Sequence, residues 1–164
     1  KAEQFARETG TKVARDLAAL ASSSNVIVSC VSADADVLGV IDGVMPHLTS
    51  DHIVIDCSTI SADTARTAAH RLRERNVPFL DAPVSGGVEG ARNATLAIMV
   101  GGDEQAFERA LPVLKAMGKV VTHFGASGAG QAAKATNQIM CAGIIQAVAK
   151  RWPSPNPRIC RSIA

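Results

Sequence analysis

Hydrophobic residues follow two alternating spacings along most of the chain, and each spacing predicts a different kind of element. Short runs rich in β-branched and other apolar residues predict buried strands at 26–31, 52–56, 78–81, 96–100 and 120–124. Apolar residues three and four positions apart predict helices over 33–48, 61–75, from 103 onward and over 128–148. Strands that alternate with helices in this way are typical of a parallel sheet with helices on both faces. The expected fold class is therefore α/β, with a doubly wound, mostly parallel sheet.

The residues before the first of these strands give a weaker pattern. Residues 1–8 predict a short charged helix that stops at Thr9 and Gly10, and residues 11–14 fit either a brief strand or a loop. Asp16 is expected to cap a small alanine-rich helix that follows it.

The tail, residues 150–164, differs in composition from the rest of the chain. Residues 150–158 contain three of the seven prolines and the only tryptophan, and prolines at this spacing cannot continue a helix. Four of the 17 Lys and Arg residues also lie in the tail, and without them 13 basic residues face 15 acidic ones, so the net charge falls from +2 to −2. A nucleic-acid partner would need a basic face on the folded domain, so none is expected.

Membrane and metal chemistry are not indicated either. No apolar run reaches the roughly 20 residues that span a bilayer, and the N-terminus has no apolar region of a secretory signal. A cytoplasmic protein with no membrane partner is expected. The four cysteines form no CxxC pair and have no histidine at metal-ligand spacing, so we expect free thiols and no metal site at Cys30, Cys57, Cys141 and Cys160.

One candidate binding loop consists of Ser85, Gly86 and Gly87. It follows a short predicted strand, at the carboxyl edge of the sheet, where open α/β folds bind their ligands. Glycine backbone N–H groups and a serine hydroxyl suit a carboxylate, although a plain turn fits the pattern equally well.

A polar stripe on the last predicted helix is a second candidate. Gln131, Lys134 and Gln138 fall at i, i+3 and i+7, with Asn137 beside them. A solvated helix face explains such a stripe. The alternative is a partly buried Lys134 that exchanges a proton with a substrate hydroxyl or carbonyl, while Asn137 and Gln138 orient the substrate.

A glycine-rich segment at 125–130 precedes this helix. Its glycines are spaced G-x-x-G-x-G, and no acidic residue follows at the distance expected for a ribose contact, so it is not a dinucleotide fingerprint. We interpret it as a helix entry at which two segments of the chain pack closely.

Three motifs occur in a characteristic order: Asp-Ala-Pro-Val-Ser-Gly-Gly at 81–87, Thr-Leu at 95–96 with Met-Val-Gly-Gly at 99–102, and Gly-Ala-Gly-Gln-Ala-Ala-Lys-Ala-Thr-Asn-Gln at 128–138. With these motifs, the chain from Lys1 to about Ala149 resembles the β-hydroxyacid dehydrogenases. That family includes 3-hydroxyisobutyrate dehydrogenase and tartronate semialdehyde reductase. The resemblance implies a Rossmann-like fold, NAD or NADP as cofactor, and homo-oligomeric full-length relatives.

The resemblance also implies a role for individual residues. Lys134 matches the catalytic lysine, which accepts the hydroxyl proton while nicotinamide takes a hydride from the alcohol carbon. The loop that grips the substrate carboxylate matches Ser85, Gly86 and Gly87, and further substrate contacts match Asn137 and Gln138. Positions that contact the dinucleotide match Val31, Ser32 and Thr59. Many members have Leu-Pro where Val31 and Ser32 stand.

Two parts of the family pattern are missing from these residues. The opening strands with the G-x-G-x-x-G turn are absent, and so is the all-helical C-terminal domain. We therefore expect a partial NAD(P)-binding domain at 1–127, the start of an interdomain helix at 128–149, and an atypical tail at 150–164. A frameshift after Ala149 is our hypothesis for the tail, and the gene sequence tests it.

The expected function is an NAD(P)-dependent oxidoreductase that interconverts a small 3-hydroxy acid, such as 3-hydroxyisobutyrate, and its semialdehyde. The chain itself is expected to be inactive. The alternatives are a non-catalytic remnant, a dinucleotide-binding or dimerisation fragment, and an enzyme similar to 6-phosphogluconate dehydrogenase, which also uses a lysine. A family without this lysine, such as the related imine reductases, fits less well.

Overall fold

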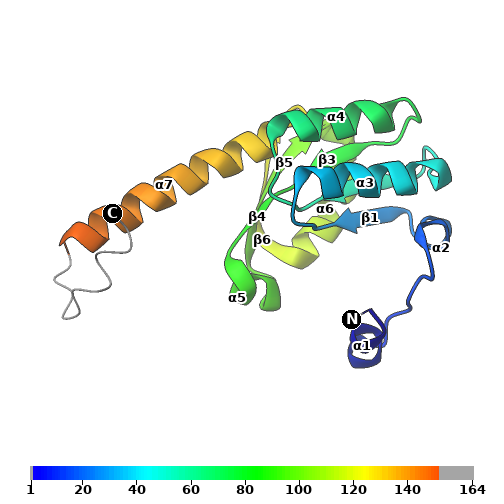
Figure 1. Ribbon diagram of the computed structural model, residues 1–164, viewed down its shortest axis with the longest axis horizontal. Coiled ribbons are helices and arrows are strands. Elements are labelled where there is room, and N and C mark those ends of the chain that lie inside the picture. The colour runs from blue at the N-terminus through cyan, green and yellow to red at the C-terminus, as the bar shows by residue number, and fades with distance from the viewer. Residues whose placement is uncertain (1, 152–164) are drawn as a thin grey trace.

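The computed structural model describes residues 2–151 and shows helices packed on a six-stranded sheet (Figure 1). The strands are β1 (Val26–Ser29), β2 (Ile53–Asp56), β3 (Phe79–Asp81), β4 (Val84–Ser85), β5 (Leu96–Gly102) and β6 (Gly118–Gly125). The helices are α1 (Ala2–Thr9), α2 (Leu17–Ser23), α3 (Asp34–Val44), α4 (Ala62–Arg73), α5 (Gly87–Arg92), α6 (Glu104–Met117) and α7 (Ala129–Arg151), with a 3₁₀ turn, η1 (Met45–His47). The predicted α/β class is confirmed.

The sheet is mixed but mostly parallel. β1, β2 and β3 are parallel neighbours, and β6 runs parallel to β5. β5 itself runs antiparallel to both β3 and β4, with Asp81 opposite Gly101 and Val84 opposite Ile98. The reversal arises because β4 continues in the direction of β3 and the short α5 then turns the chain back, whereas a crossover helix would have kept the next strand parallel.

The helix starts agree with the sequence expectations. Asp16, Ser61 and Asp103 each use a side-chain oxygen to accept a backbone N–H of the first helical turn, at 2.7, 3.0 and 2.9 Å. These bonds satisfy donors that have no partner inside the helix. The predicted cap of α2 at Asp16 is therefore confirmed, and α4 and α6 begin where helices were expected.

Several boundaries differ from the expectations. The helix predicted over 33–48 ends at Val44 and continues as the 3₁₀ turn η1, because Pro46 has no N–H to donate to the α-helical ladder. Residues 11–14 form no regular element, and β4 and α5 were not predicted. α7 extends to Arg151. The rest of the predicted tail, 152–164, lies outside the described residues.

Two hydrophobic cores lie on opposite faces of the sheet. One is enclosed by α3 and α4 and includes Ile41, Val54 and Leu72. The other is covered by α6 and includes Ile55 and Leu80 together with residues of β5 and α6. Val54 and Ile55 are consecutive in β2 and point to opposite faces, as the pleat of a strand requires. The doubly wound arrangement is therefore confirmed.

The second half of α7 lies apart from these cores. Figure 1 shows α7 extending well beyond the sheet. Its apolar side chains are exposed there, at Ile139, Met140, Ile144, Ile145 and Val148. Among the described residues, no helix combines the length and hydrophobicity that crossing a membrane requires.

Candidate active site

The helix that carries Lys134 begins against the ends of two strands. Asp81, the last residue of β3, accepts hydrogen bonds through its carboxylate from the backbone N–H groups of Gly128 (2.7 Å) and Gln131 (3.0 Å). Backbone N–H groups at a helix start have no partner within the helix. The carboxylate of Asp81 therefore fixes the start of α7 relative to the sheet.

Two glycines permit this close approach. A Cβ on Gly130 would lie 2.6 Å from the carbonyl oxygen of Asp81, and a Cβ on Gly101 would lie 2.7 Å from the backbone nitrogen of Gly130. Gly128 is a third close contact, with a Cβ position 3.0 Å from the carbonyl oxygen of Ala62. The prediction that segment 125–130 lets two parts of the chain pack closely is confirmed.

Lys134 lies at one wall of a pocket with a volume of about 570 Å³. Its Nζ donates a hydrogen bond to Oε1 of Gln138 (3.0 Å), and Nδ2 of Asn137 donates to the same oxygen (3.1 Å). The Lys134 side chain is buried, with 8% of the residue exposed, so the solvated-stripe interpretation fails for this residue. The pocket is lined by Lys134, Gln138, Ser85, Gly86, Gly87, Val84, Val88, Ala91 and Leu96.

The loop opposite Lys134 depends on its glycines. Ser85 belongs to β4 and pairs with Ala97 of β5, which fixes its position. Gly86 and Gly87 have φ angles of 136° and 62°. Residues with a Cβ adopt such angles only under strain. The segment is thus both a turn and one wall of the pocket, so the two interpretations of the sequence are compatible.

Asn137 faces a different hollow. It lines a groove of about 550 Å³ between α7 and the β5–β6 part of the sheet, together with Met99, Phe124 and Met140. Its connection to the Lys134 pocket is the hydrogen bond to Gln138 described above. The structure therefore brings together five of the six residues expected to bind or transform a substrate, and Asn137 touches the pocket only indirectly.

The residues expected to contact a dinucleotide meet at the carboxyl edge of the sheet. Val31 and Ser32 follow β1, and Thr59 follows β2, its parallel neighbour. The backbone N–H of Val31 donates to Oγ of Ser58 (2.9 Å), which joins the two loops. Ser32 and Thr59 are exposed. Their hydroxyl groups suit the polar groups of a dinucleotide, which open α/β sheets bind at this edge.

Gln131 has a structural role that the sequence did not indicate. Its side-chain Nε2 donates to the carbonyl oxygen of Ser58 (2.8 Å), and its Oε1 accepts from the backbone N–H of Ile60 (3.2 Å). The residue is 3% exposed. The spacing of the polar residues placed Gln131 on the same helix face as Lys134. It could not indicate the partners Ile60 and Ser58, which lie 71 and 73 positions away in the sequence.

Asp56 and Asp81 were also missed as separate features, although each ends a predicted buried strand. Asp56 accepts hydrogen bonds at Oδ1 from the hydroxyl groups of Ser29 and Ser58, both at 2.7 Å. Its Oδ2 is buried and has no hydrogen-bond partner among the described residues. Burial raises the pKa of both carboxyl groups, and their hydrogen bonds partly oppose that shift. The sequence feature that could have indicated these two residues is a carboxylate at the end of an apolar run.

The cysteines within the described residues are free thiols, as expected. Burial raises the pKa of the Cys57 thiol to about 12, with smaller contributions from Cys30 and Asp56. No group of three or more His, Cys, Asp and Glu side chains suited to a metal ion occurs in the part of the chain that the structure describes.

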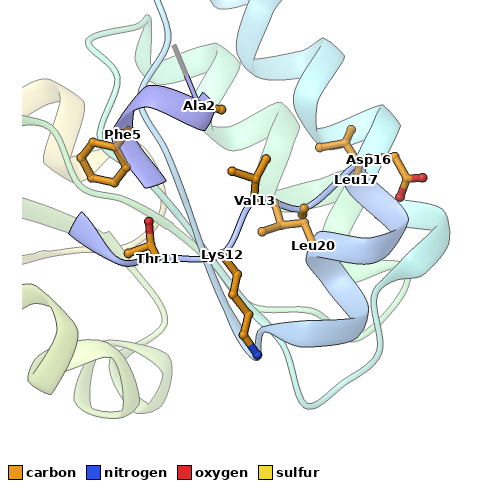
Figure 2. Close-up of a pocket in the computed structure, with 9 residues that line it drawn as sticks. Ala2, Phe5, Thr11, Lys12, Val13, Asp16, Leu17 and Leu20 are labelled. Carbon is orange, nitrogen blue, oxygen red and sulfur yellow. The ribbon is translucent and has the colours of Figure 1, made fainter. Parts of the chain in front are cut away.

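A separate hollow of about 560 Å³ lies between α1 and α2 (Figure 2). Most of the side chains that line it are apolar, including Phe5, Val13 and Leu20. The side chain of Lys12 extends away from that of Val13 (Figure 2). Asp16 also lines it, but its carboxylate is engaged in capping α2. None of the predicted site residues lies there, so this hollow does not belong to the candidate site.

Comparison with known proteins identifies the family. Residues 1–125 match the family model described as the NAD binding domain of 6-phosphogluconate dehydrogenase. The chain belongs to this family of NAD-binding domains. The predicted NAD-dependent oxidoreductase family and Rossmann-like fold are thereby confirmed.

Relatives of this NAD-binding domain include 3-hydroxyacid dehydrogenases. The chain is 46% identical over 112 residues to the 3-hydroxyisobutyrate dehydrogenase of Pseudomonas aeruginosa, covering 66% of this chain and 38% of that protein. It is 40% identical to the NAD-dependent L-serine dehydrogenase of the same organism, covering 81% and 46%. The structure of Mycobacterium tuberculosis 3-hydroxyisobutyrate dehydrogenase with L-serine superposes with a TM-score of 0.83 at 38% identity, covering 90% and 50%. The chain thus spans about half the length of the relatives it matches.

Proposed function

We propose that these residues form the nucleotide-binding half of an enzyme that interconverts a small 3-hydroxy acid and its semialdehyde with NAD or NADP. One observation carries the proposal: Lys134 and Gln138 line the same pocket as Ser85, Gly86 and Gly87. A proton-transfer group therefore faces a loop suited to a carboxylate. In this proposal residues 1–127 are the partial nucleotide-binding domain, and 128–149 begin the interdomain helix.

The chemistry assigns a task to each wall of the pocket. Ser85 and the glycines would hold the substrate carboxylate, and Gln138 would orient the hydroxyl-bearing carbon. Bound NAD or NADP would supply the hydride acceptor, held at Val31, Ser32 and Thr59. Lys134 Nζ takes the hydroxyl proton as the carbonyl forms, and it returns a proton in the reverse reduction. Asn137 supports the site through its hydrogen bond to Gln138.

A chimeric enzyme tests this assignment directly. Residues 1–149 replace the matching segment of the Pseudomonas aeruginosa 3-hydroxyisobutyrate dehydrogenase, and NAD-linked oxidation of 3-hydroxyisobutyrate and L-serine is measured. Lys134→Met in the chimera should lower kcat by about 10²–10⁴-fold, the usual contribution of a positioned acid–base group. Lys115→Met, at an exposed lysine of α6, is the matched control and should leave kcat unchanged. Equal rates in the two variants would refute the role of Lys134.

The 164-residue chain alone is proposed to bind the dinucleotide weakly and to turn over no substrate. The apolar side chains of α7 beyond Gln138 are exposed, so no other described residues cover this stretch of the helix. A rate of NAD-linked oxidation by the purified chain far above that of its Lys134→Ala variant would contradict this. The exposed apolar side chains of α7 also support homo-oligomer formation, and a cytoplasmic location is part of the same proposal.

A further inference from the structure

Gln131 connects helix α7 to the loop that follows β2 through its side chain. Its side-chain amide bonds both ways to one loop, donating to Ser58 at 2.8 Å and accepting from Ile60 at 3.2 Å. Both ends of the amide are therefore used, as a buried amide requires. Among the described residues, these two bonds are the side-chain hydrogen bonds that link α7 to the loop after β2.

The loop that Gln131 holds is the one that contains Thr59. Ser58 and Ile60, its two partners, flank Thr59, which is exposed while both neighbours are buried. Ser58 also accepts the N–H of Val31 and donates to Asp56 through its hydroxyl. A displacement of the loop by a ligand at Thr59 must therefore move or strain the bonds to Gln131.

The other end of the connection is held by a hydrogen bond and by close packing. The backbone N–H of Gln131 donates to the carboxylate of Asp81, and a Cβ on Gly130 would lie only 2.6 Å from the carbonyl oxygen of Asp81. Lys134 lies one turn further along the same helix face, three residues from Gln131. A force on the Gln131 side chain is thus transmitted to the part of α7 that carries Lys134.

We propose that Gln131 is a positioning residue that couples the Ser58–Ile60 loop to the helix segment carrying Lys134, so that the dinucleotide edge and the proton-transfer group move as one unit. The coupling to a ligand rests on the proposed dinucleotide contact at Thr59. The mechanical coupling itself exists in the free chain and is measurable there.

Hydrogen exchange of the full chain, followed by NMR in low denaturant, tests the coupling without any ligand. In the wild type the amides of Ile60 and Lys134 should open together, with equal opening free energies. Gln131→Met keeps the length and burial of the side chain but removes both bonds. Protection at Ile60 should then fall on the order of tenfold, the equivalent of one lost hydrogen bond, while Lys134 remains protected. Gln146→Met, the same substitution at an exposed position of α7, should change neither amide.

A second variant separates positioning from simple stabilisation. Gln131→Glu, when protonated, can still donate to Ser58 and accept from Ile60, whereas the ionised form has no proton to donate. The bond lost on ionisation is the one to the carbonyl oxygen of Ser58, because a carboxylate can still accept the N–H of Ile60. The ¹³C chemical shift of the Ser58 carbonyl should therefore recover toward its wild-type value as the pH falls. Asp56, which is hydrogen-bonded to Ser58, and Asp81 at the helix start also titrate in this network. The pH dependence measured for Gln131→Met is therefore the baseline that accounts for these two carboxyl groups. Unchanged protection at Ile60 in Gln131→Met, or no recovery of the Ser58 carbonyl shift at low pH in Gln131→Glu, would overturn the proposal.

Titration with NAD⁺ then tests the link to the proposed function. In the wild type, chemical-shift changes at Thr59 should be accompanied by changes at the side chains of Lys134 and Gln138, and Gln131→Met should keep the first and lose the second. Changes at Thr59 alone in the wild type would overturn the coupling. No change at Thr59 would overturn the dinucleotide contact instead, and the exchange measurements would still decide the coupling.

Discussion

Two carboxyl groups are buried at the ends of neighbouring strands, and both bear on how the chain responds to pH. Asp56 and Asp81 are fully buried, and burial raises the pKa of each above its ordinary value of 3.8. A carboxyl group with a raised pKa binds protons more tightly in the folded chain. Its contribution to stability is therefore greatest below the unfolded pKa and is lost as the pH rises through the folded one.

Asp56→Asn should reduce this pH dependence. The amide oxygen can still accept from Ser29 and Ser58, and the amide nitrogen replaces Oδ2, which has no partner among the described residues. The free energy of unfolding of the variant, from urea titrations, should fall less than that of the wild type as the pH rises above 3.8. Asp51→Asn, at an exposed position, is the control and should keep the wild-type slope. Identical slopes for Asp56→Asn and the wild type would show that folding does not raise the pKa of Asp56.

Helix α7 is the element on which the candidate site depends, and its two halves differ sharply. The first half is held by Asp81 and by close packing at Gly130, and the second half is exposed. The same helix therefore offers one glycine with no free space, Gly130, and one with nothing within 4 Å of an added Cβ, Gly143.

Alanine substitutions at these two glycines should have opposite effects. In Gly130→Ala the new Cβ would meet the carbonyl oxygens of Met99 and Asp81, so the helix start must shift, at a cost of about 1–3 kcal/mol or more. Gly143→Ala should stabilise the chain by about 0.5–1 kcal/mol, because alanine loses less backbone entropy in a helix. Urea unfolding followed by circular dichroism measures both. A Gly130→Ala chain as stable as the wild type would mean that α7 does not approach Asp81 this closely.

For the whole molecule, the distribution of apolar surface is uneven. The two cores are well enclosed, but Val28 on the edge strand β1 is 44% exposed, and Ile139 on α7 is 74% exposed. Exposed apolar side chains on α7, together with the unpaired edge of strand β1, favour association with another surface.

The chain should consequently self-associate as its concentration rises. Light scattering coupled to size-exclusion chromatography should show a mass that increases with concentration, and the double variant Ile144→Glu, Ile145→Glu should shift it toward the monomer. Ala147→Glu adds charge to the same helix without removing a large apolar side chain, and it should have a smaller effect. A monodisperse, cooperatively melting wild-type chain would contradict the expectation and would favour an independent binding module.

Local features of the sequence predicted most of the elements and indicated the candidate site. Spacing of apolar residues indicated the strands and helices, because it reflects which side of each element is buried. The caps at Asp16, Ser61 and Asp103 were predictable because their bonds span three residues. Lys134 and Gln138 could be placed on one helix face for the same reason, since they are four residues apart.

Only the tertiary structure decided the direction of β5 and the partners of the buried polar groups. An apolar run indicates a strand but carries no sign of its direction, which here depends on how α5 turns the chain back after β4. Gln131 meets Ser58 and Ile60 across more than 70 residues, and Asp81 meets the start of α7 across about 50. Such contacts depend on the packing of whole elements, whereas the sequence pattern reports only that a position is buried or polar.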